Sequence, residues 1–302
     1  MIQDRRQTVI VVAGPTAVGK TSVAIELARY YDTAIISADS RQCYKELNIG
    51  VARPAPEELA QAQHFFIASH SIEDEVNAAG FADYAVEKAL LVFRRRSVVI
   101  MCGGTGLYIR AFCDGLDDIP EIPLLIRERI NRSYEREGKA WLQQQLRLHD
   151  PLFAISGEME NPHRMMRALE VVEATGKSIL SFHKGRKADH DFNIIRIGLD
   201  MPRVDLYKRI NTRVDQMMEE GLLEEVIRLR PYRHLKALQT VGYAELFDYL
   251  DGKTTLVEAV ELIRQHTRQY AKRQLTWFRR DSTMQWFHPS AMEDILNHLP
   301  EA

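Results

Sequence analysis

The sequence has little that would tie it to an oxidising compartment, a zinc site or a membrane. Only three of its 302 residues are cysteine, Cys43, Cys102 and Cys113, and no two of them form a C-x-x-C pair. This spacing argues against a structural zinc site, and reduced core cysteines are the simpler interpretation. No apolar run reaches transmembrane length, and no signal-peptide core follows residues 1–6. We therefore expect a cytoplasmic protein with no membrane contact.

The sequence also has little net charge, because 40 Lys and Arg residues face 42 Asp and Glu residues and leave a formal charge of −2. A global attraction to nucleic acid is therefore excluded, and any such binding must depend on local basic patches. The apolar fraction of 45% is that of an ordinary globular protein. A length of 302 residues allows one or two domains with a substantial core.

The most informative feature present is a complete G-x-x-x-x-G-K-T phosphate loop, Gly14-Pro15-Thr16-Ala17-Val18-Gly19-Lys20-Thr21. A β-branched apolar run at 8–13 precedes it and predicts a buried strand, and apolar residues at helical spacing follow at 22–28. In this context backbone N–H groups and the helix dipole face an anion, Lys20 adds positive charge, and Thr21 can hold Mg²⁺. A chance glycine-rich turn is the alternative, and it does not explain this context. We therefore predict a site for a diphosphate or polyphosphate.

Further strands are predicted by apolar runs at 33–38 and 97–102, with a helix between them at 81–96. Asp39 follows the first of these strands and should lie beside the phosphate loop, because ligands bind beyond the carboxyl ends of parallel strands. Asp39 has a second interpretation as a helix N-cap, since an Asp-Ser pair is good capping chemistry. The second strand ends in Cys102 and two glycines, where an ATPase would usually place an acid.

Helices dominate the second half of the sequence. A proline-punctuated linker at 117–123 leads into a helical segment from 124 to about 181, with turns expected at Gly138, 149–151 and 161–162. The segment closes with a polar stretch at 183–189, and an apolar run at 194–199 then predicts a returning core strand. The predicted fold class is α/β: a P-loop parallel-sheet core, similar to nucleoside-triphosphate hydrolases, with a helical insertion and a helical C-terminal part. We place the core domain at 1–118 and 193–302 and the insertion at 119–192.

Two arginine patterns lie in the C-terminal helices. A predicted helix at 205–220 carries Arg209 and Arg213 one turn apart, hence on one face. A predicted helix from about 255 to 280 carries Arg264, Arg268 and Lys272 at spacings of four residues. This second row is either a solvated surface or a stripe that follows a phosphate backbone.

Together these motifs resemble the tRNA dimethylallyltransferase (tRNA isopentenyltransferase) family in its bacterial form. The matching segments cover nearly the whole chain in the family's order: the phosphate loop, 36–44, 103–108, 164–171, 209–217, 241–243 and 267–277. Departures are small. Phe65 and Phe66 stand where members often have a histidine and a leucine, and Val51 replaces a common threonine.

The resemblance implies transfer of a dimethylallyl group from dimethylallyl diphosphate to N6 of the tRNA adenosine on the 3′ side of the anticodon, position 37. The phosphate loop would hold the diphosphate rather than a nucleoside triphosphate, with Mg²⁺ bound through Thr21. Because charge grows on the leaving diphosphate, Lys20, the loop amides, Mg²⁺ and an arginine suit the transition state. By resemblance, Arg213 is that arginine, and Asp39 accepts the proton from N6.

The resemblance also implies contacts to the anticodon stem-loop of tRNA, for which the insertion provides a grip. The implied contact residues are Asp39, Ser40, Arg41 and Gln42; Thr105; Arg127; Asn161, Pro162, His163, Arg164 and Met165; and Gln239, Thr240, Val241, Gly242, Tyr243 and Ala244. The target base must leave its stack to reach a buried site, so a deep channel is expected. We expect a monomer.

Two other classes of function stay open from the residues alone. A small-molecule kinase on the same fold would use Asp39 to deprotonate a substrate hydroxyl, although the missing strand-end acid and the large insertion disfavour it. A non-catalytic RNA-binding protein with a vestigial phosphate loop is disfavoured by the intact Gly19-Lys20-Thr21. Incubation with labelled dimethylallyl diphosphate and tRNA, beside labelled ATP, separates the three.

Overall fold

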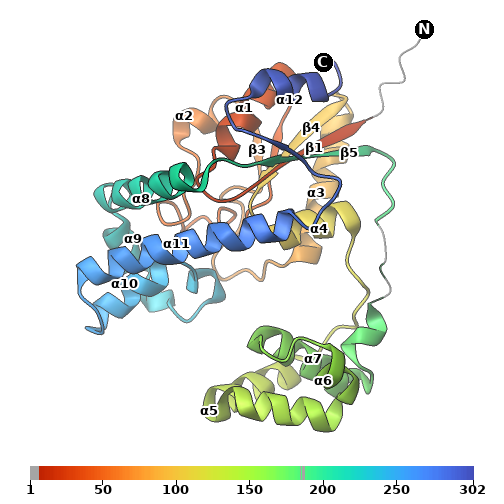
Figure 1. Ribbon diagram of the computed structural model, residues 1–302, viewed down its shortest axis with the longest axis vertical. Coiled ribbons are helices and arrows are strands. Elements are labelled where there is room, and N and C mark those ends of the chain that lie inside the picture. Colours follow the sequence, from red (N-terminus) through yellow and green to blue (C-terminus); the bar gives the residue numbers. More distant parts are fainter. Residues whose placement is uncertain (1–6, 184, 186–187) are drawn as a thin grey trace. The chain divides into compact units, whose positions relative to one another are not determined.

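The computed structural model describes residues 7–183, 185 and 188–302 (Figure 1). The expectations for residues 1–6 and for part of the polar stretch 183–189 therefore fall outside the described residues. The chain divides into two compact units, one of residues 1–113 and 189–302 and one of residues 114–188. The bounds placed from the sequence, 118/119 and 192/193, lie four or five residues from this division.

A six-stranded parallel sheet forms the centre of the first unit, in the order β3-β2-β4-β1-β5-β6 (Figure 1). Its strands are β1 (Thr8–Ala13), β2 (Ile35–Ser37), β3 (His64–Phe65), β4 (Val98–Gly103), β5 (Asn193–Leu199) and β6 (Gln285–Phe287). The predicted α/β class with a parallel sheet is confirmed. All strands run in the same direction. The phosphate loop after β1 and the segments after β2 and β4 therefore leave the sheet on the same side, at the carboxyl ends of the strands.

The sequence predicted β1, β2, β4 and β5 but missed β3 and β6. These two strands form the edges of the sheet and are two and three residues long. Such short, half-exposed segments carry no visible alternation of apolar and polar residues, which is the signal that identifies a strand.

Helices cover the sheet and extend beyond it. They are α1 (Lys20–Tyr30), α2 (Pro56–Leu59), α3 (Ala78–Phe93), α4 (Gly106–Asp114), α8 (Arg203–Glu219), α9 (Leu222–Leu229), α10 (Tyr243–Leu250), α11 (Leu256–Phe278) and α12 (Met292–His298). Ile10 of β1 and Ile100 of β4 join one core cluster with Leu27 of α1, Ile210 of α8 and Ile295 of α12. Helix α11 packs along α8 and α10 (Figure 1). The three cysteines are free, and two of them are buried.

The second unit is a helical insertion with its own core. It contains α5 (Leu124–His149), α6 (Pro151–Ser156), α7 (Pro162–Thr175) and a 3-10 turn at Ile179–Phe182. Ile130 and Leu146 of α5 pack with Leu169 of α7. The expected turn at Gly138 is present as a break in α5, with φ 75° and ψ −167°. Among the described residues of both units, no helix has the length and apolar character needed to cross a membrane.

The end of β4 offers a test of this sheet. A Cβ added to Gly103 would lie 2.2 Å from the carbonyl oxygen of Ala38, a backbone atom that cannot move aside as a side chain can. We expect Gly103→Ala to lower the free energy of unfolding by about 1–3 kcal/mol, measured by urea denaturation.

The matched control is Gly80→Ala in the first turn of α3, where the nearest atom to the new Cβ is 3.7 Å away. This change should be neutral or stabilise the protein by up to about 1 kcal/mol, because alanine favours helix. Equal destabilisation by both changes would show that β2 and β4 do not approach as closely as described.

Candidate active site

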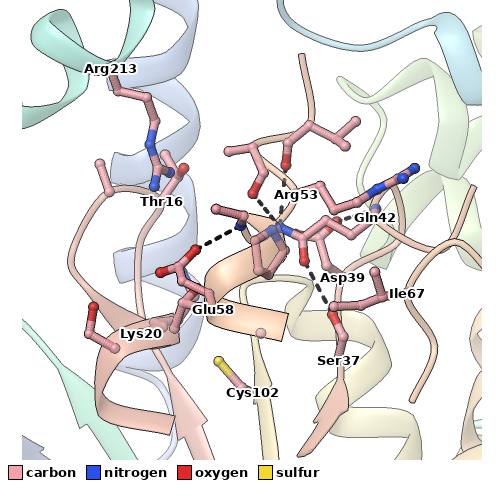
Figure 2. A pocket seen from close by; sticks show the side chains of 18 of the residues that line it. Thr16, Lys20, Ser37, Asp39, Gln42, Arg53, Glu58, Ile67, Cys102 and Arg213 are labelled. Atoms are coloured by element: carbon pink, nitrogen blue, oxygen red, sulfur yellow. Dashed lines mark hydrogen bonds between the residues drawn. The ribbon is translucent and has the colours of Figure 1, made fainter. Parts of the chain in front are cut away.

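A cavity of about 640 Å³ lies at the carboxyl ends of β1, β2 and β4 (Figure 2). Segments distant in the sequence contribute to its walls: the phosphate loop, the turn after β2, and helices α8 and α11. Six side chains matter for its chemistry: Lys20, Thr21, Asp39, Gln42, Arg213 and Gln274. In Figure 2, Thr16, Lys20 and Arg213 lie on one side of the view and Asp39 and Gln42 on the other. The structure thus brings the predicted phosphate site, the predicted base and the predicted arginine around one space.

The phosphate loop forms an anion cradle at the start of α1. Gly19 caps the helix with φ 108°, a left-handed conformation that favours glycine, and Lys20 is the first helical residue. The ammonium of Lys20 donates a hydrogen bond to the carbonyl of Pro15 at 2.8 Å. The N–H groups of Ala17 and Gly19 have no hydrogen-bond partner within the described part of the chain. Free N–H groups at a helix N-terminus are the donors that a phosphate group requires.

Positive charge in the cavity is compensated only in part, although the acids Asp39, Glu58 and Glu220 also line it. Burial lowers the pKa of the Lys20 ammonium from 10.5 to about 8, and Asp39 opposes this shift only in part. Burial also lowers the pKa of Arg213, and the neighbouring Arg209 adds to that effect. Neither Lys20 nor Arg213 forms an ion pair with another described residue. A bound anion would stabilise both cations, so the electrostatics favour a ligand with several negative charges.

Gln274 of α11 fixes the phosphate loop to the turn after β4. Its Oε1 accepts a hydrogen bond from the N–H of Thr16 at 2.8 Å, and its Nε2 donates one to the carbonyl of Gly104 at 2.9 Å. The side chain is buried, and a Cβ on Gly104 would lie 2.3 Å from Nε2. Sequence reasoning missed Gln274, because nothing but its place in the family-like stretch 267–277 distinguishes it from other polar residues of a helix.

Asp39 is held by one oxygen and leaves the other unbonded. Its Oδ1 accepts hydrogen bonds from the N–H groups of Arg41 at 2.8 Å and Gln42 at 3.2 Å. Within residues 7–183, 185 and 188–302, Oδ2 has no partner. The N-cap interpretation is wrong, since residues 40–43 form turns and no helix begins there. The carboxylate instead organises a turn whose N–H groups fix its orientation.

Thr105 connects this turn to the end of β4. Its hydroxyl accepts a hydrogen bond from the N–H of Ser40 at 3.0 Å, and its own N–H donates to the carbonyl of Ala38 at 3.2 Å. On the other side, the amide of Gln42 donates to the carbonyl of Ala52 at 2.9 Å. The predicted tRNA-contact residues 39–42 and Thr105 are therefore parts of one hydrogen-bonded group at the cavity.

The predicted contact segment 239–244 is tied to the cavity rim through Glu225 of α9. The buried carboxylate of Glu225 accepts hydrogen bonds from the Tyr243 hydroxyl at 2.5 Å and from the N–H groups of Ile49 at 2.9 Å and Gly50 at 3.1 Å. Tyr243 is fully buried, whereas Gln239 and Ala244 are exposed. Glu225 was also missed from the sequence, because an acid in an amphipathic helix usually faces solvent.

The remaining predicted contacts lie in the insertion. Asn161 caps α7 by accepting hydrogen bonds from the N–H groups of His163 at 3.1 Å and Arg164 at 3.3 Å. Arg164 is exposed and pairs with Glu158, and Arg127 lies 3.8 Å from Glu170. Pro162 is half-buried, and the side chain of Met165 is fully buried in the insertion core, so that only the backbone of Met165 is available for a contact.

The basic row of α11 is largely paired within the protein. Arg264 forms ion pairs with Asp215 of α8 and with Glu261, and Arg268 bonds to Asn211 at 2.8 Å and to Glu261 at 3.1 Å. These contacts hold α11 to α8. They disfavour the phosphate-binding stripe, and they give Arg264 and Arg268 a packing role that the solvated-surface interpretation did not include.

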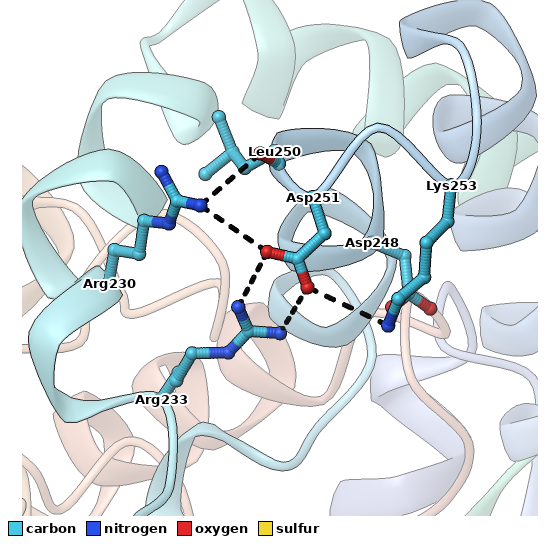
Figure 3. A network of polar contacts seen from close by, with 6 residues as sticks. All are labelled: Arg230, Arg233, Asp248, Leu250, Asp251 and Lys253. Carbon is cyan, nitrogen blue, oxygen red and sulfur yellow. Dashed lines mark hydrogen bonds and ion pairs between the residues drawn. The ribbon is translucent and has the colours of Figure 1, made fainter.

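Two arginines that follow α9 also have acidic partners within the protein (Figure 3). Asp251 accepts hydrogen bonds from Arg233 at 2.7 and 2.8 Å and from Arg230 at 3.3 Å, and it lies 3.6 Å from Lys253. The bonds from Arg233 hold the pKa of Asp251 well below its usual range.

A divalent cation fits this site only if oxygen atoms of the bound ligand also coordinate it. No group of three or more His, Cys, Asp or Glu side chains able to hold a metal occurs among the described residues. The hydroxyl of Thr21 lines the cavity and has no hydrogen-bond partner in the described chain. One hydroxyl, diphosphate oxygens and water are a ligand set typical of Mg²⁺.

Comparison with known proteins agrees with this geometry. The family model of the IPP transferases matches residues 42–281. The chain is 45% identical to tRNA dimethylallyltransferase 1 of Bacteroides thetaiotaomicron over 292 residues, 97% of this chain and 95% of the relative.

Among solved structures, the full-length tRNA isopentenylpyrophosphate transferase of Bacillus halodurans is 35% identical, with a TM-score of 0.71 over 97% of this chain and 95% of that one. A eukaryotic dimethylallyltransferase described as acting on tRNA has a TM-score of 0.79 over 98% of this chain and 81% of that one, and at 22% identity it supports the fold alone. On these matches, and as its motifs predicted, the chain belongs to the IPP transferase family.

Proposed function

We propose that this protein transfers the dimethylallyl group of dimethylallyl diphosphate to N6 of adenosine 37 in tRNA and releases diphosphate. Family membership supports a dimethylallyl transfer to tRNA. One observation supports dimethylallyl diphosphate as the donor and N6 of adenosine 37 as the acceptor. A single cavity holds the unbonded oxygen of Asp39 together with the phosphate loop and two unpaired cations, Lys20 and Arg213. A base and an anion cradle are the two parts that such a displacement needs.

In the reaction, the lone pair of N6 forms a bond to the allylic carbon while the bond from that carbon to the diphosphate oxygen breaks. The electron pair of the broken bond stays on the leaving diphosphate. The free N–H groups of the phosphate loop, Lys20 and Arg213 stabilise this charge, because charge-assisted hydrogen bonds are strongest where charge develops. Mg²⁺ held by Thr21 supplies further positive charge to the diphosphate when bound.

The proton of N6 goes to Asp39. Because two N–H groups hold Oδ1, the carboxylate keeps one orientation and presents Oδ2 as the proton acceptor. The exocyclic amine is a poor base and loses its proton only as the new bond gives it positive charge. A carboxylate that is fixed in place suits this step, since no reorientation is needed during the reaction.

We assign tRNA binding to the group around Asp39 and Thr105, to the exposed residues Gln239 and Ala244, and to the insertion through His163 and Arg164. The target base must be drawn from its stack before N6 can meet Oδ2. A monomeric state and a cytoplasmic location stay predictions.

A kinase activity is the second candidate, and one observation speaks against it. Cys102, near the end of β4, occupies the place where an ATPase carries an acid, and burial raises the pKa of this thiol to about 12. It is therefore neutral at physiological pH and cannot organise an ATP–metal–water assembly as a carboxylate does.

The direct test is incubation of the protein with Mg²⁺, labelled dimethylallyl diphosphate and bulk tRNA, followed by nucleoside analysis. We expect label on N6-modified adenosine and release of one diphosphate per transfer. In the parallel incubation with labelled ATP we expect no turnover. ATP consumption at the roughly 1–100 per second typical of kinases would contradict the proposal.

Replacement of Asp39 by asparagine tests the assigned base. Asparagine still accepts the N–H bonds of Arg41 and Gln42 through its Oδ1, so the turn and the thermal melt should be nearly unchanged. It cannot take the proton, so single-turnover prenyl transfer with both substrates saturating should slow by about 10²–10⁴-fold.

Asp74→Asn is the matched control, since Asp74 accepts the N–H of Ser71 in an exposed loop outside the cavity. It should leave the rate unchanged. Near-normal turnover of Asp39→Asn would remove Asp39 from the mechanism.

Arg264 and Arg268 are paired and their side chains are only 28% and 23% exposed, so we predict that they do not contact tRNA phosphates. Arg164 also pairs with Glu158, but its side chain is 56% exposed and can exchange that partner for a phosphate. The double change to glutamine should leave the slope of log affinity against log salt unchanged in tRNA binding. Arg164→Gln in the insertion should flatten that slope by up to about 0.9, the value for one lost phosphate contact. A slope that flattens by about twice that amount in the double variant would return the row of α11 to the phosphate-binding interpretation.

A further inference from the structure

The guanidinium of Arg209 lies over the phosphate loop without an anionic partner. A Cβ placed on Gly19 would lie 3.6 Å from Nη2 of Arg209 and 3.8 Å from Nη1. Arg209 lines the same cavity as Arg213 and lies one turn before it in α8. The side chain of Arg209 is exposed. In the part of the chain that the structure describes, it makes no hydrogen bond and no ion pair.

This placement is electrostatically unfavourable in the absence of a ligand. Gly19 caps the N-terminus of α1, where the helix dipole presents positive charge. The charge of Arg209 acts on Arg213, whose pKa is lowered chiefly by burial and next by Arg209. Two guanidinium groups and a helix N-terminus therefore converge on one small region. A multivalent anion placed between them would turn each of these repulsions into an attraction.

Two arginines of the adjoining helix α11 differ from Arg209 in having polar partners. Arg264 pairs with Asp215 of α8, and Arg268 bonds to Asn211 of the same helix. Helix α8 thus offers acceptors to arginines of α11, whereas its own Arg209, beside the phosphate loop, has no acceptor among the described residues.

We propose that Arg209 is a second arginine of the diphosphate site and binds the diphosphate directly above the phosphate loop, while Arg213 reaches the same anion from the helical turn that follows. This inference rests on the proposed function, since it assumes that the loop holds a diphosphate. Arg209 is exposed, and it contacts the anion equally before and after cleavage of the carbon–oxygen bond. It therefore contributes equally to binding of substrate and of product, so that its loss raises KM more than it lowers kcat.

The test is binding of inorganic pyrophosphate with Mg²⁺, measured by titration calorimetry without tRNA. Arg209→Ala should weaken pyrophosphate binding by about 10- to 100-fold, the effect of one charge-assisted hydrogen bond. Arg209→Lys should recover part of that loss, because it keeps the charge without the planar fork. Lys208→Ala is the matched control: Lys208 is the preceding residue of α8, is exposed and does not line the cavity. It should change the affinity by less than about twofold.

Two further readouts separate the outcomes. In prenyl transfer, Arg209→Ala should raise the KM for dimethylallyl diphosphate by a similar factor while kcat stays within a few-fold. Its affinity for tRNA and its thermal melt should match the parent. Unchanged pyrophosphate binding in Arg209→Ala, or a loss of tRNA affinity in its place, would overturn the role of Arg209 and leave the proposed function intact. A parent protein that fails to bind pyrophosphate would overturn the diphosphate site itself.

Discussion

The amide of Gln274 is the contact on which the geometry of the site depends most. One side of it fixes the phosphate loop at Thr16, and the other fixes the turn after β4 at Gly104. The next residue of that turn, Thr105, holds Ser40 and so the segment that carries Asp39. A short chain of hydrogen bonds therefore sets the distance between the anion cradle and the base. Loss of the buried bond to Gly104 would leave a polar group unsatisfied, at a cost of about 1–3 kcal/mol.

The parallel sheet makes this connection possible. With β4 next to β1 and β2 next to β4, the three loops that carry the phosphate site, the Thr105 turn and Asp39 leave the sheet side by side. Helix α8, which follows β5 on the other side of β1, adds Arg209 and Arg213 from across the cradle. In the proposed reaction the leaving group would lie among these positive charges, while Asp39 follows β2, which β4 separates from β1.

Much of this arrangement could be predicted from the sequence, because its main signals are local. The phosphate loop is a contiguous motif, the four longer strands are apolar runs, and the position of Asp39 follows from its place after a strand. The row of Arg264, Arg268 and Lys272 is an intermediate case. Their spacing shows that these residues share a helix face. Only the structure shows that Arg264 and Arg268 bond to two acids and one amide, Asp215, Glu261 and Asn211.

The residues that could not be predicted act through tertiary contacts. Gln274 and Glu225 are single polar residues in helices, and nothing in their local pattern says that a loop distant in the sequence lies against them. The spacing of Arg209 and Arg213 shows a shared helix face, but only the structure shows that Arg209 lies beside the phosphate loop. Asp39 was ambiguous for a related reason, since an aspartate that caps a helix and one that organises a turn have the same sequence neighbours. The edge strands β3 and β6 are too short to show the alternation of apolar and polar residues that identifies a strand.

In the proposed site, the phosphate loop holds a diphosphate leaving group while the free oxygen of Asp39 stays available for a proton. A crystal structure of the protein with Mg²⁺ and pyrophosphate tests it most directly. We expect pyrophosphate oxygens within about 2.7–3.2 Å of the loop N–H groups and of Lys20, with Oδ2 of Asp39 bonded to neither the anion nor the metal. Pyrophosphate bound outside the loop, or a metal ion coordinated by Asp39, would contradict the account.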